Sequence, residues 1–171
     1  ITNRFKNRLI AKVITRYPSL AQHFITAYEP WESGETVPWA PPHKPLAECK
    51  LALVTTSGVH HSAQEPFDLQ DSDGDPSFRA IDAAPIGNDY QITHDYYDHS
   101  HAEKDLNIIF PLQRLQELQQ EGVIGQLADT HYSFMGHIDG RHIATLIGQA
   151  AQEVVKRLKQ DQVDVVLLTP A

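Results

Sequence analysis

Residues 141–169 read RHIATLIGQAAQEVVKRLKQDQVDVVLLT, and this stretch decides the fold. Its first part repeats apolar residues with a helical period, which predicts an amphipathic helix over residues 141–159. The apolar positions are Ile143, Leu146, Ile147, Ala150, Val154, Val155 and Leu158. After Asp161, the almost entirely apolar run 163–169 predicts a buried strand. A helix that leads directly into such a strand is typical of α/β proteins.

A similar strand is predicted earlier, over residues 50–56, and it is closed by a turn at Ser57 and Gly58. Two such strands and the helix favour a Rossmann-like layered α/β fold with a partly parallel sheet. In parallel sheets, sites form at the carboxyl ends of the strands. Here those ends are residues 56–60 and 169–171, so we expect both at one edge of the sheet.

The rest of the chain divides into two parts. Residues 1–46 are predicted to hold an amphipathic helix over residues 4–16, which ends before Pro18, and a Pro-rich arm. Trp31 and Trp39 offer apolar surface, so we expect the arm to wrap around the domain. Residues 47–171 form the α/β domain, with a further helix after Pro111 that Gly122 closes. Residues 59–104 have little periodicity and predict a long loop rich in His and Asp.

Charge and composition exclude several classes of protein. The net charge of −8 disfavours nucleic acid as a partner, and the basic residues between Arg4 and Arg16 are interpreted as the solvated face of a helix. The sequence has neither an apolar run long enough to cross a bilayer nor a signal-peptide pattern, so we expect a cytoplasmic protein without membrane contact. The lone Cys49 excludes an internal disulfide and a Cys-based zinc site, and it is interpreted as a small buried residue.

The densest group of reactive side chains lies in residues 93–101, with the sequence THDYYDHSH. Its His and Asp residues suit zinc or iron, but a loop held by hydrogen bonds without metal is favoured. Residues 71–75 (DSDGD) resemble the opening of a calcium loop, yet Pro76 replaces the glycine of the sharp turn. Although Asp82 falls at the twelfth position, a turn whose Asp side chains bond to their own backbone is favoured.

Two further segments carry candidate site residues. His60 and His61 follow the turn of the first strand, where a His can act as an acid or base or lie on the surface. Residues 131–137 (HYSFMGH) are interpreted as a connection before a helix. There Gly136 permits close backbone approach, and the helix amides either hold an anion or are capped by the connection itself.

Many ordered segments together are similar to the glycine/sarcosine/betaine/D-proline reductase selenoprotein B family. The matching stretches are 38–46, 53–60, 66–68, 73–79, 93–99, 105–111, 131–137 and 164–170. The resemblance implies reductive cleavage of a carbon–nitrogen bond in a small amine or amino acid. The nucleophile is a selenocysteine or cysteine that thiols regenerate, so partner reductase subunits or a thiol reductant are expected. No bound cofactor is expected within these residues.

The family places its redox residue directly after the segment that corresponds to residues 168–171. We therefore expect a chain that stops before that residue and is inactive without it. Reading of a selenocysteine codon as a stop is favoured over removal of the rest of the protein.

The expected site combines this resemblance with the geometry of the sheet edge. The candidate catalytic residues are His60, His94, Asp95 and His99, with His60 and His94 preferred for proton transfer. The candidate substrate-binding residues are Thr56, Ser57, Gly58, His131, Met135, Gly136 and His137, and no metal ligand is assigned. The competing functions are a metal-dependent hydrolase that uses His94, Asp95, Asp98 and His99, and a non-catalytic subunit that binds a small molecule. An open sheet edge also suggests a homo-oligomer.

Overall fold

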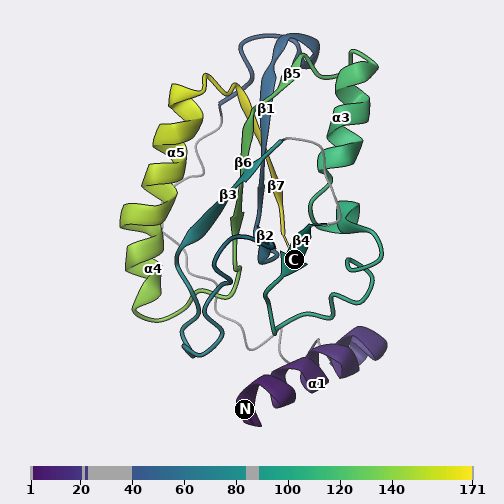
Figure 1. Cartoon of the computed structure of the whole chain (residues 1–171), viewed down its shortest axis with the longest axis vertical. Coiled ribbons are helices and arrows are strands. Elements are labelled where there is room, and N and C mark those ends of the chain that lie inside the picture. The colour runs from purple at the N-terminus through teal and green to yellow at the C-terminus, as the bar shows by residue number, and fades with distance from the viewer. Residues whose placement is uncertain (1, 21, 23–39, 84–88, 171) are drawn as a thin grey trace.

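A computed structural model describes residues 2–20, 22, 40–83 and 89–170. The main sheet contains β1 (Lys50–Thr55), β3 (Phe78–Asp82), β5 (Gln126–Leu127), β6 (Thr130–Phe134) and β7 (Val165–Thr169). β1 lies in the middle, with β7 parallel to it on one side and β5 and β6 parallel to it on the other; β3 then pairs antiparallel with β6 (Figure 1). The expected α/β fold with a partly parallel sheet is therefore confirmed.

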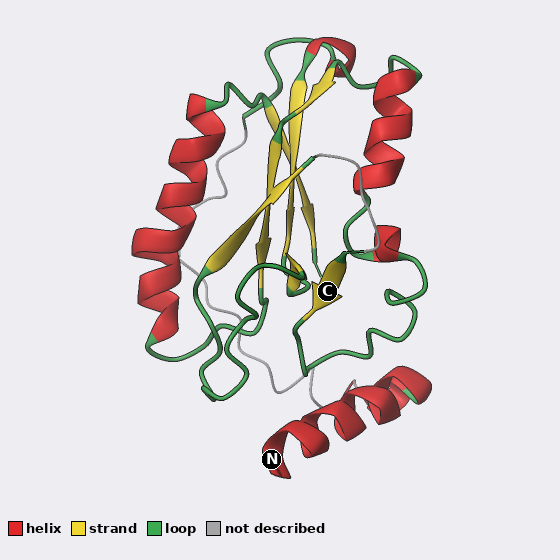
Figure 2. Cartoon of the chain, in the orientation of Figure 1, coloured by secondary structure: helices red, strands yellow, loops and turns green. Residues whose placement is uncertain are grey.

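Helices cover the two faces of this sheet (Figure 2). On one face lies α3 (Leu112–Gln120); on the other lies a helical stretch made of α4 (His142–Thr145), a π-helical turn (Leu146–Ala150) and α5 (Ala151–Gln160). Alternate residues of β1 pack on the two opposite faces of the sheet. Leu51 and Leu53 pack in a core with α3, whereas Ala52 and Val54 pack in a core with α5.

The predicted helices and strands in this domain are largely confirmed. The α3 helix ends before Gly122, whose φ of 73° closes it, and the amphipathic pattern over residues 141–159 forms one helical stretch with the π-helical turn in its middle. The strands predicted over residues 50–56 and 163–169 are β1 and β7. They are direct neighbours, with Thr55 opposite Thr169. Their carboxyl ends therefore meet at one edge of the sheet, as expected.

The long loop predicted over residues 59–104 is broken by strands that the sequence does not reveal. β2 (Val59–His61) and β4 (Tyr90–Ile92) form a small antiparallel sheet, and β3 also lies in this range. These strands are only three to five residues long, too short to establish a period in the sequence.

The interpretation of residues 131–137 as a connection before a helix is wrong. Residues Thr130–Phe134 form β6, and the next helix begins only at His142. The signal is hidden because β6 is buried on both faces. Tyr132 and Phe134 lie in the core with α5, while the polar residues His131 and Ser133 are buried on the other face.

The Asp-rich turn at residues 71–75 is confirmed as a turn held by its own backbone. The Asp71 carboxylate accepts a hydrogen bond from the Asp73 amide at 3.0 Å, and Asp75 accepts one from the Ser77 amide at 2.8 Å. Asp82 lies in β3 and not at the end of a calcium loop.

Other expectations concern the ends of the domain. Cys49 is buried before β1, as expected, and its thiol contacts the Lys44 carbonyl at 3.5 Å. The Pro-rich segment with Trp31 and Trp39 falls outside the described residues, so its wrapping of the domain stays a prediction. β7 lies at the edge of the sheet, and Leu168 on it is 69% exposed; pairing between chains at this edge also stays a prediction.

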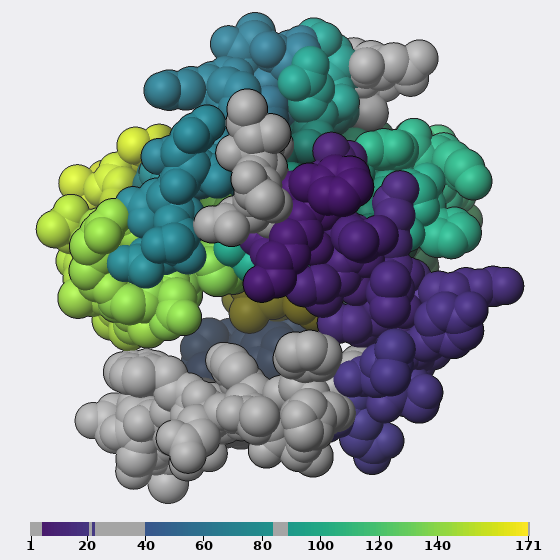
Figure 3. Space-filling model, turned by 90° about the horizontal axis from the view of Figure 1, so that it is seen from below, coloured from purple at the N-terminus to yellow at the C-terminus, as the bar shows by residue number. Residues whose placement is uncertain are grey.

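The first helix, α1 (Thr2–Arg16), contains its predicted range, and its basic residues Lys6, Arg8, Lys12 and Arg16 are exposed, as expected of a solvated face. It lies at the lower end of the molecule in Figure 1 and faces the viewer in Figure 3, and its Arg8 and Lys12 border cavities that the His/Asp-rich segment also lines. Within the described ranges, no helix combines the length and the apolar character needed to cross a membrane.

Candidate functional site

The principal cavity lies between α1 and the segments that follow β2 and β4. Its volume is about 350 Å³, which falls within the range of small-ligand sites. Four segments line it: α1, residues 66–70, residues 92–95 and His99. The lining residues are Arg8, Pro66, Phe67, Asp68, Leu69, Gln70, Ile92, Thr93, His94, Asp95 and His99.

His94 connects this cavity to the carboxyl edge of the sheet. Its Nδ1 accepts a hydrogen bond from the Tyr96 amide at 3.0 Å, so the ring proton lies on Nε2. Burial, reinforced by the nearby imidazoles of His137 and His99, lowers the pKa of His94 to about 4. At neutral pH His94 is therefore an uncharged ring that offers a hydrogen-bond donor at Nε2.

Gly136 makes the contact between His94 and the strand ends possible. Its φ is 91°, and a Cβ atom at this position would lie 2.1 Å from the Thr56 carbonyl oxygen and 3.3 Å from His94 Nε2. The backbone after β6 thus lies directly against the backbone after β1, with the His94 ring beside both. The expectation of close backbone approach at Gly136 is confirmed.

A set of hydroxyl groups fixes the ends of β1 and β7. The hydroxyls of Thr55 and Thr169 both donate to the Ile109 carbonyl, each at 2.9 Å. Ser57 Oγ lies 2.7 Å from Thr55 Oγ1, and because the Thr55 proton is given to Ile109, the Ser57 hydroxyl is the donor. The Thr56 amide donates to the Thr169 carbonyl at 3.1 Å. The two strand ends therefore form one hydrogen-bonded unit.

His60 lies beneath this edge with no exposed surface. Its Nδ1 lies 2.9 Å from the His61 carbonyl and its Nε2 lies 2.8 Å from the Thr93 hydroxyl. Because a carbonyl only accepts, Nδ1 carries the proton and Nε2 accepts from Thr93. Both ring nitrogens are thus occupied, and this arrangement gives His60 a structural role between β2 and the segment after β4.

His131 is also fully buried, in the middle of the sheet. Its Nδ1 accepts a hydrogen bond from the Leu53 amide at 3.0 Å, at the point where the pairing of β1 passes from β5 to β6. Burial lowers the pKa of His131 to about 4. Among the described residues, its Nε2 and the Ser133 hydroxyl have no hydrogen-bond partner. His131 therefore replaces a missing strand partner and does not line the principal cavity.

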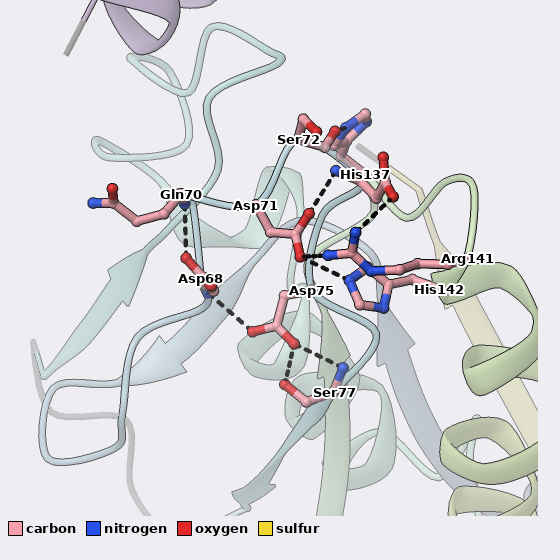
Figure 4. A network of polar contacts seen from close by, with 10 residues as sticks. Asp68, Gln70, Asp71, Ser72, Asp75, Ser77, His137, Arg141 and His142 are labelled. Atoms are coloured by element: carbon pink, nitrogen blue, oxygen red, sulfur yellow. Dashed lines mark hydrogen bonds and ion pairs between the residues drawn. The ribbon is translucent and has the colours of Figure 1, made fainter.

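The segment after β6 is joined to the Asp-rich turn by polar contacts (Figure 4). His137 Nε2 donates to the Ser72 carbonyl at 3.0 Å, and its ring stacks on Tyr96 with a centroid distance of 3.9 Å. Asp71 pairs with Arg141 and lies 3.0 Å from His142 Nε2. The hydrogen bond from His142, followed by the bond from the Asp73 amide, lowers the pKa of Asp71 to about 2. These contacts join the Asp-rich turn, which directly follows the cavity-lining residues 66–70, to the start of α4.

The remaining members of the His/Asp-rich segment form their own contacts. His99 Nδ1 lies 2.7 Å from the Glu103 carboxylate, which only accepts, so Nδ1 donates this hydrogen bond, and His99 also borders the cavity. The Tyr97 hydroxyl donates to the Ser57 carbonyl at 3.1 Å, and burial raises the pKa of Tyr97. Asp98 accepts from the Ser100 amide at 3.1 Å.

The structure therefore brings together some of the predicted residues and separates others. His94, Asp95 and His99 line one cavity, with Gly136 and the end of β1 directly behind His94. Met135 is buried, as are His60 and His131. In the part of the chain that is described, no three His, Cys, Asp or Glu side chains are grouped as metal ligands, so the hydrolase alternative has no assembled metal site there.

Sequence reasoning missed most of the residues that line the cavity, among them Arg8, Phe67 and Asp68. The basic residues of the first helix were a usable signal. In an acidic chain, a basic helix face opposite an Asp-rich segment indicates a contact as readily as a solvated surface.

Comparisons with known proteins agree with one another. The family model of glycine/sarcosine/betaine reductase selenoprotein B matches residues 5–171. The chain is 37% identical over 131 residues to the D-proline reductase subunit gamma of Acetoanaerobium sticklandii, a match that covers 77% of this chain and 52% of the relative. It is 32% identical over 149 residues to a glycine reductase complex component B subunit gamma of Symbiobacterium thermophilum, covering 85% of this chain and 34% of that relative.

A sarcosine reductase complex component B subunit beta of Peptoclostridium acidaminophilum is 30% identical over 160 residues, which cover 86% of this chain and 34% of the relative. The matches thus span about half the length of the first relative and about a third of the other two. No solved structure gave a significant match.

Proposed function

The chain belongs to the glycine/sarcosine/betaine reductase selenoprotein B family, and from this premise we propose that it holds the substrate for reductive cleavage of a carbon–nitrogen bond. The substrate is a small amine or amino acid, of the kind named for the relatives. The redox residue is a selenocysteine or cysteine directly after Ala171. The relatives are components of reductase complexes, so partner subunits take part in the complete reaction.

The proposed reaction needs two electrons and two protons. The selenolate or thiolate attacks the carbon that bears the nitrogen, a carbon–selenium or carbon–sulfur bond forms, and the amine leaves with one proton. A thiol then attacks the selenium or sulfur, and the carbon takes the second proton. A second thiol releases the redox residue, so that two thiols are oxidised to a disulfide for each bond cleaved.

One observation carries the proposal: the carboxyl ends of β1, β6 and β7 meet beside the Nε2 atom of His94. β7 ends at Thr169, and the hydroxyls of Thr169 and Thr55 donate to the same acceptor, the Ile109 carbonyl. A residue that follows β7 therefore starts from an anchored strand end. This supports a nucleophile held at the edge of the sheet that the cavity approaches, because such anchoring fixes its geometry before the substrate arrives.

The described side chains suit distinct tasks in this reaction. His94 is neutral, with Nδ1 occupied, so it acts as a hydrogen-bond donor through Nε2 that orients the substrate. His99, supported by the Glu103 carboxylate at 2.7 Å, is the group that delivers the proton to the leaving nitrogen. This division modifies the expectation that His94 itself transfers the proton.

The test uses a chain that carries cysteine directly after Ala171, incubated with dithiothreitol and with D-proline, glycine, sarcosine or betaine in turn. We expect one C–N bond cleaved for each disulfide formed, with D-proline opening to a linear amino acid. A version with serine in place of that cysteine is the control, and His94→Ala should abolish turnover. Equal product formation by the cysteine and serine versions would refute the proposed function.

The hydrolase alternative is separated by elemental analysis. Stoichiometric zinc or iron in the purified chain, together with thiol-independent release of amine, would replace the reductase proposal with metal-assisted hydrolysis.

A further inference from the structure

We propose that Arg8 on α1 binds the carboxylate of the ligand in the principal cavity and so selects ligands that carry one. The inference rests on the proposed function in one respect, namely that this cavity is the substrate pocket. It adds a residue of the N-terminal helix to the site, and this residue lies outside the set predicted from the sequence.

Arg8 lies at the border of two cavities. Arg8 borders the principal cavity of about 350 Å³ and also a smaller neighbouring cavity of about 60 Å³. His99 borders both cavities too, so the two cavities share Arg8 and His99. α1 therefore forms a wall of the site.

Within the described part of the chain, Arg8 takes part in no hydrogen bond or ion pair. Lys12 borders the smaller cavity as well, but it has an electrostatic partner: after the Ser100 hydrogen bonds, its charge helps to lower the pKa of Asp98. A guanidinium without a protein partner, at the rim of a cavity, is available to a ligand anion. Its planar fork matches a carboxylate with two parallel hydrogen bonds.

Charged groups of both signs line the cavity. Among the described residues that line it, Arg8 is the one Lys or Arg, and the carboxylates are those of Asp95 and of Asp68, which is exposed. His94, which is uncharged, and the apolar residue Phe67 also line the cavity. A small zwitterion fits this arrangement, with its carboxylate toward Arg8 and its ammonium group toward the acidic wall.

The test is a binding measurement, which does not need the redox residue. D-proline and D-prolinamide are titrated into the native chain and its variants, and glycine, sarcosine and betaine into the native chain. Binding is followed by isothermal titration calorimetry or by ligand-observed NMR. The amide keeps the ring and the amine but lacks the carboxylate charge. The variants are Arg8→Gln, Arg8→Lys and, as a matched control on the same helix, Arg16→Gln.

We expect the native chain to prefer D-proline over D-prolinamide. Arg8→Gln should weaken D-proline binding roughly 10- to 100-fold, the range for loss of a charge-assisted hydrogen bond, and leave D-prolinamide binding unchanged. Arg8→Lys should keep part of the preference, because it keeps the charge but loses the fork. Arg16→Gln should behave like the native chain.

Three outcomes would count against the proposal, and each has a different meaning. If Arg8→Gln keeps the preference for D-proline, Arg8 is not the carboxylate site, while the cavity and the proposed reaction still stand. If Arg16→Gln weakens binding as much as Arg8→Gln, the effect is general helix charge and not a specific contact. If the native chain binds neither D-proline nor glycine, sarcosine or betaine, both the role of Arg8 and the cavity as a substrate pocket are overturned.

Discussion

Gly136→Ala tests the contact on which the geometry of the site depends. The new Cβ atom would lie 2.1 Å from the Thr56 carbonyl oxygen, whereas ordinary contact begins at 3.4 Å, so the two backbone segments would have to separate by more than an ångström. The obstacle is backbone, and the Thr56 amide is itself bonded to the Thr169 carbonyl at 3.1 Å. Neither partner can therefore rotate away.

The expected loss of stability has two parts. Alanine at a φ of 91° is strained, which costs about 1–2 kcal/mol, and forcing extra volume into packed structure costs about 1–3 kcal/mol. Gly122→Ala isolates the first part, because Gly122 has a φ of 73° but nothing within 4 Å of its added Cβ atom. Unfolding free energies from urea titrations followed by circular dichroism give the comparison. Gly136→Ala should be less stable than Gly122→Ala by about 1–3 kcal/mol.

Equal losses in the two variants would refute this reasoning, because the close approach of residues 56 and 136 would then contribute nothing. A second measurement applies to the site itself. Since the same Cβ atom would lie 3.3 Å from His94 Nε2, the chemical shifts of the His94 ring should change in Gly136→Ala and remain unchanged in Gly122→Ala.

Other measurements test the buried and paired groups. NMR titration should show His94 and His131 gaining protons near pH 4 and not near pH 6.5. Because the unfolded chain takes up these protons at higher pH than the folded chain, the free energy of unfolding should fall as the pH drops from 6.5 toward 4. Titration midpoints near 6.5 would contradict this. His131→Leu should lower the unfolding free energy by about 1–3 kcal/mol, because the Leu53 amide loses its acceptor, and a neutral effect would argue against that role. The pKa of Asp71 is about 2 in the folded chain against an ordinary value of 3.8, so its contribution to the free energy of unfolding should be present above pH 3.8 and lost toward pH 2. Asp71→Asn should lack this pH dependence of stability. Identical stability profiles for the native chain and the variant would refute the prediction. Cys49 is fully buried, so a thiol reagent should react with it in denaturant but not in the native chain; rapid native labelling would contradict its burial.

The sequence predicts the parts of this fold in which one property dominates a long segment. The helix over residues 141–159 and the strands β1 and β7 are apolar enough to be recognised, and their order predicts that their carboxyl ends share an edge. β6 escapes because its buried face uses His131 and Ser133, so the usual contrast between apolar and polar positions is absent. The short strands β2, β3 and β4 depend on pairing partners far away in the chain, which no local pattern reveals.

The site divides in a similar way. Residues at strand ends, such as Thr56 and Gly136, follow from the fold class, and His94 follows from the unusual density of His and Asp. What a histidine does depends on its neighbours, and composition does not show them. His60 and His131 satisfy backbone and hydroxyl groups inside the domain, whereas His94 faces the cavity. The contribution of Arg8 depends on how α1 lies against the domain, which its own amphipathic pattern does not determine.

The π-helical turn at Leu146–Ala150 sets the rotational phase of the helical stretch. Such a turn takes up one more residue than an α-helical turn, so the helix before it is rotated by roughly 100° relative to an uninterrupted α-helix. His142 stands on the first side of this turn and is paired with Asp71, while Val154 and Leu158 stand on the other side and pack on the sheet. One additional residue therefore lets the same helix satisfy two neighbours that lie in different directions. Deleting a residue from this turn would force a choice between holding the wall of the cavity and filling the core.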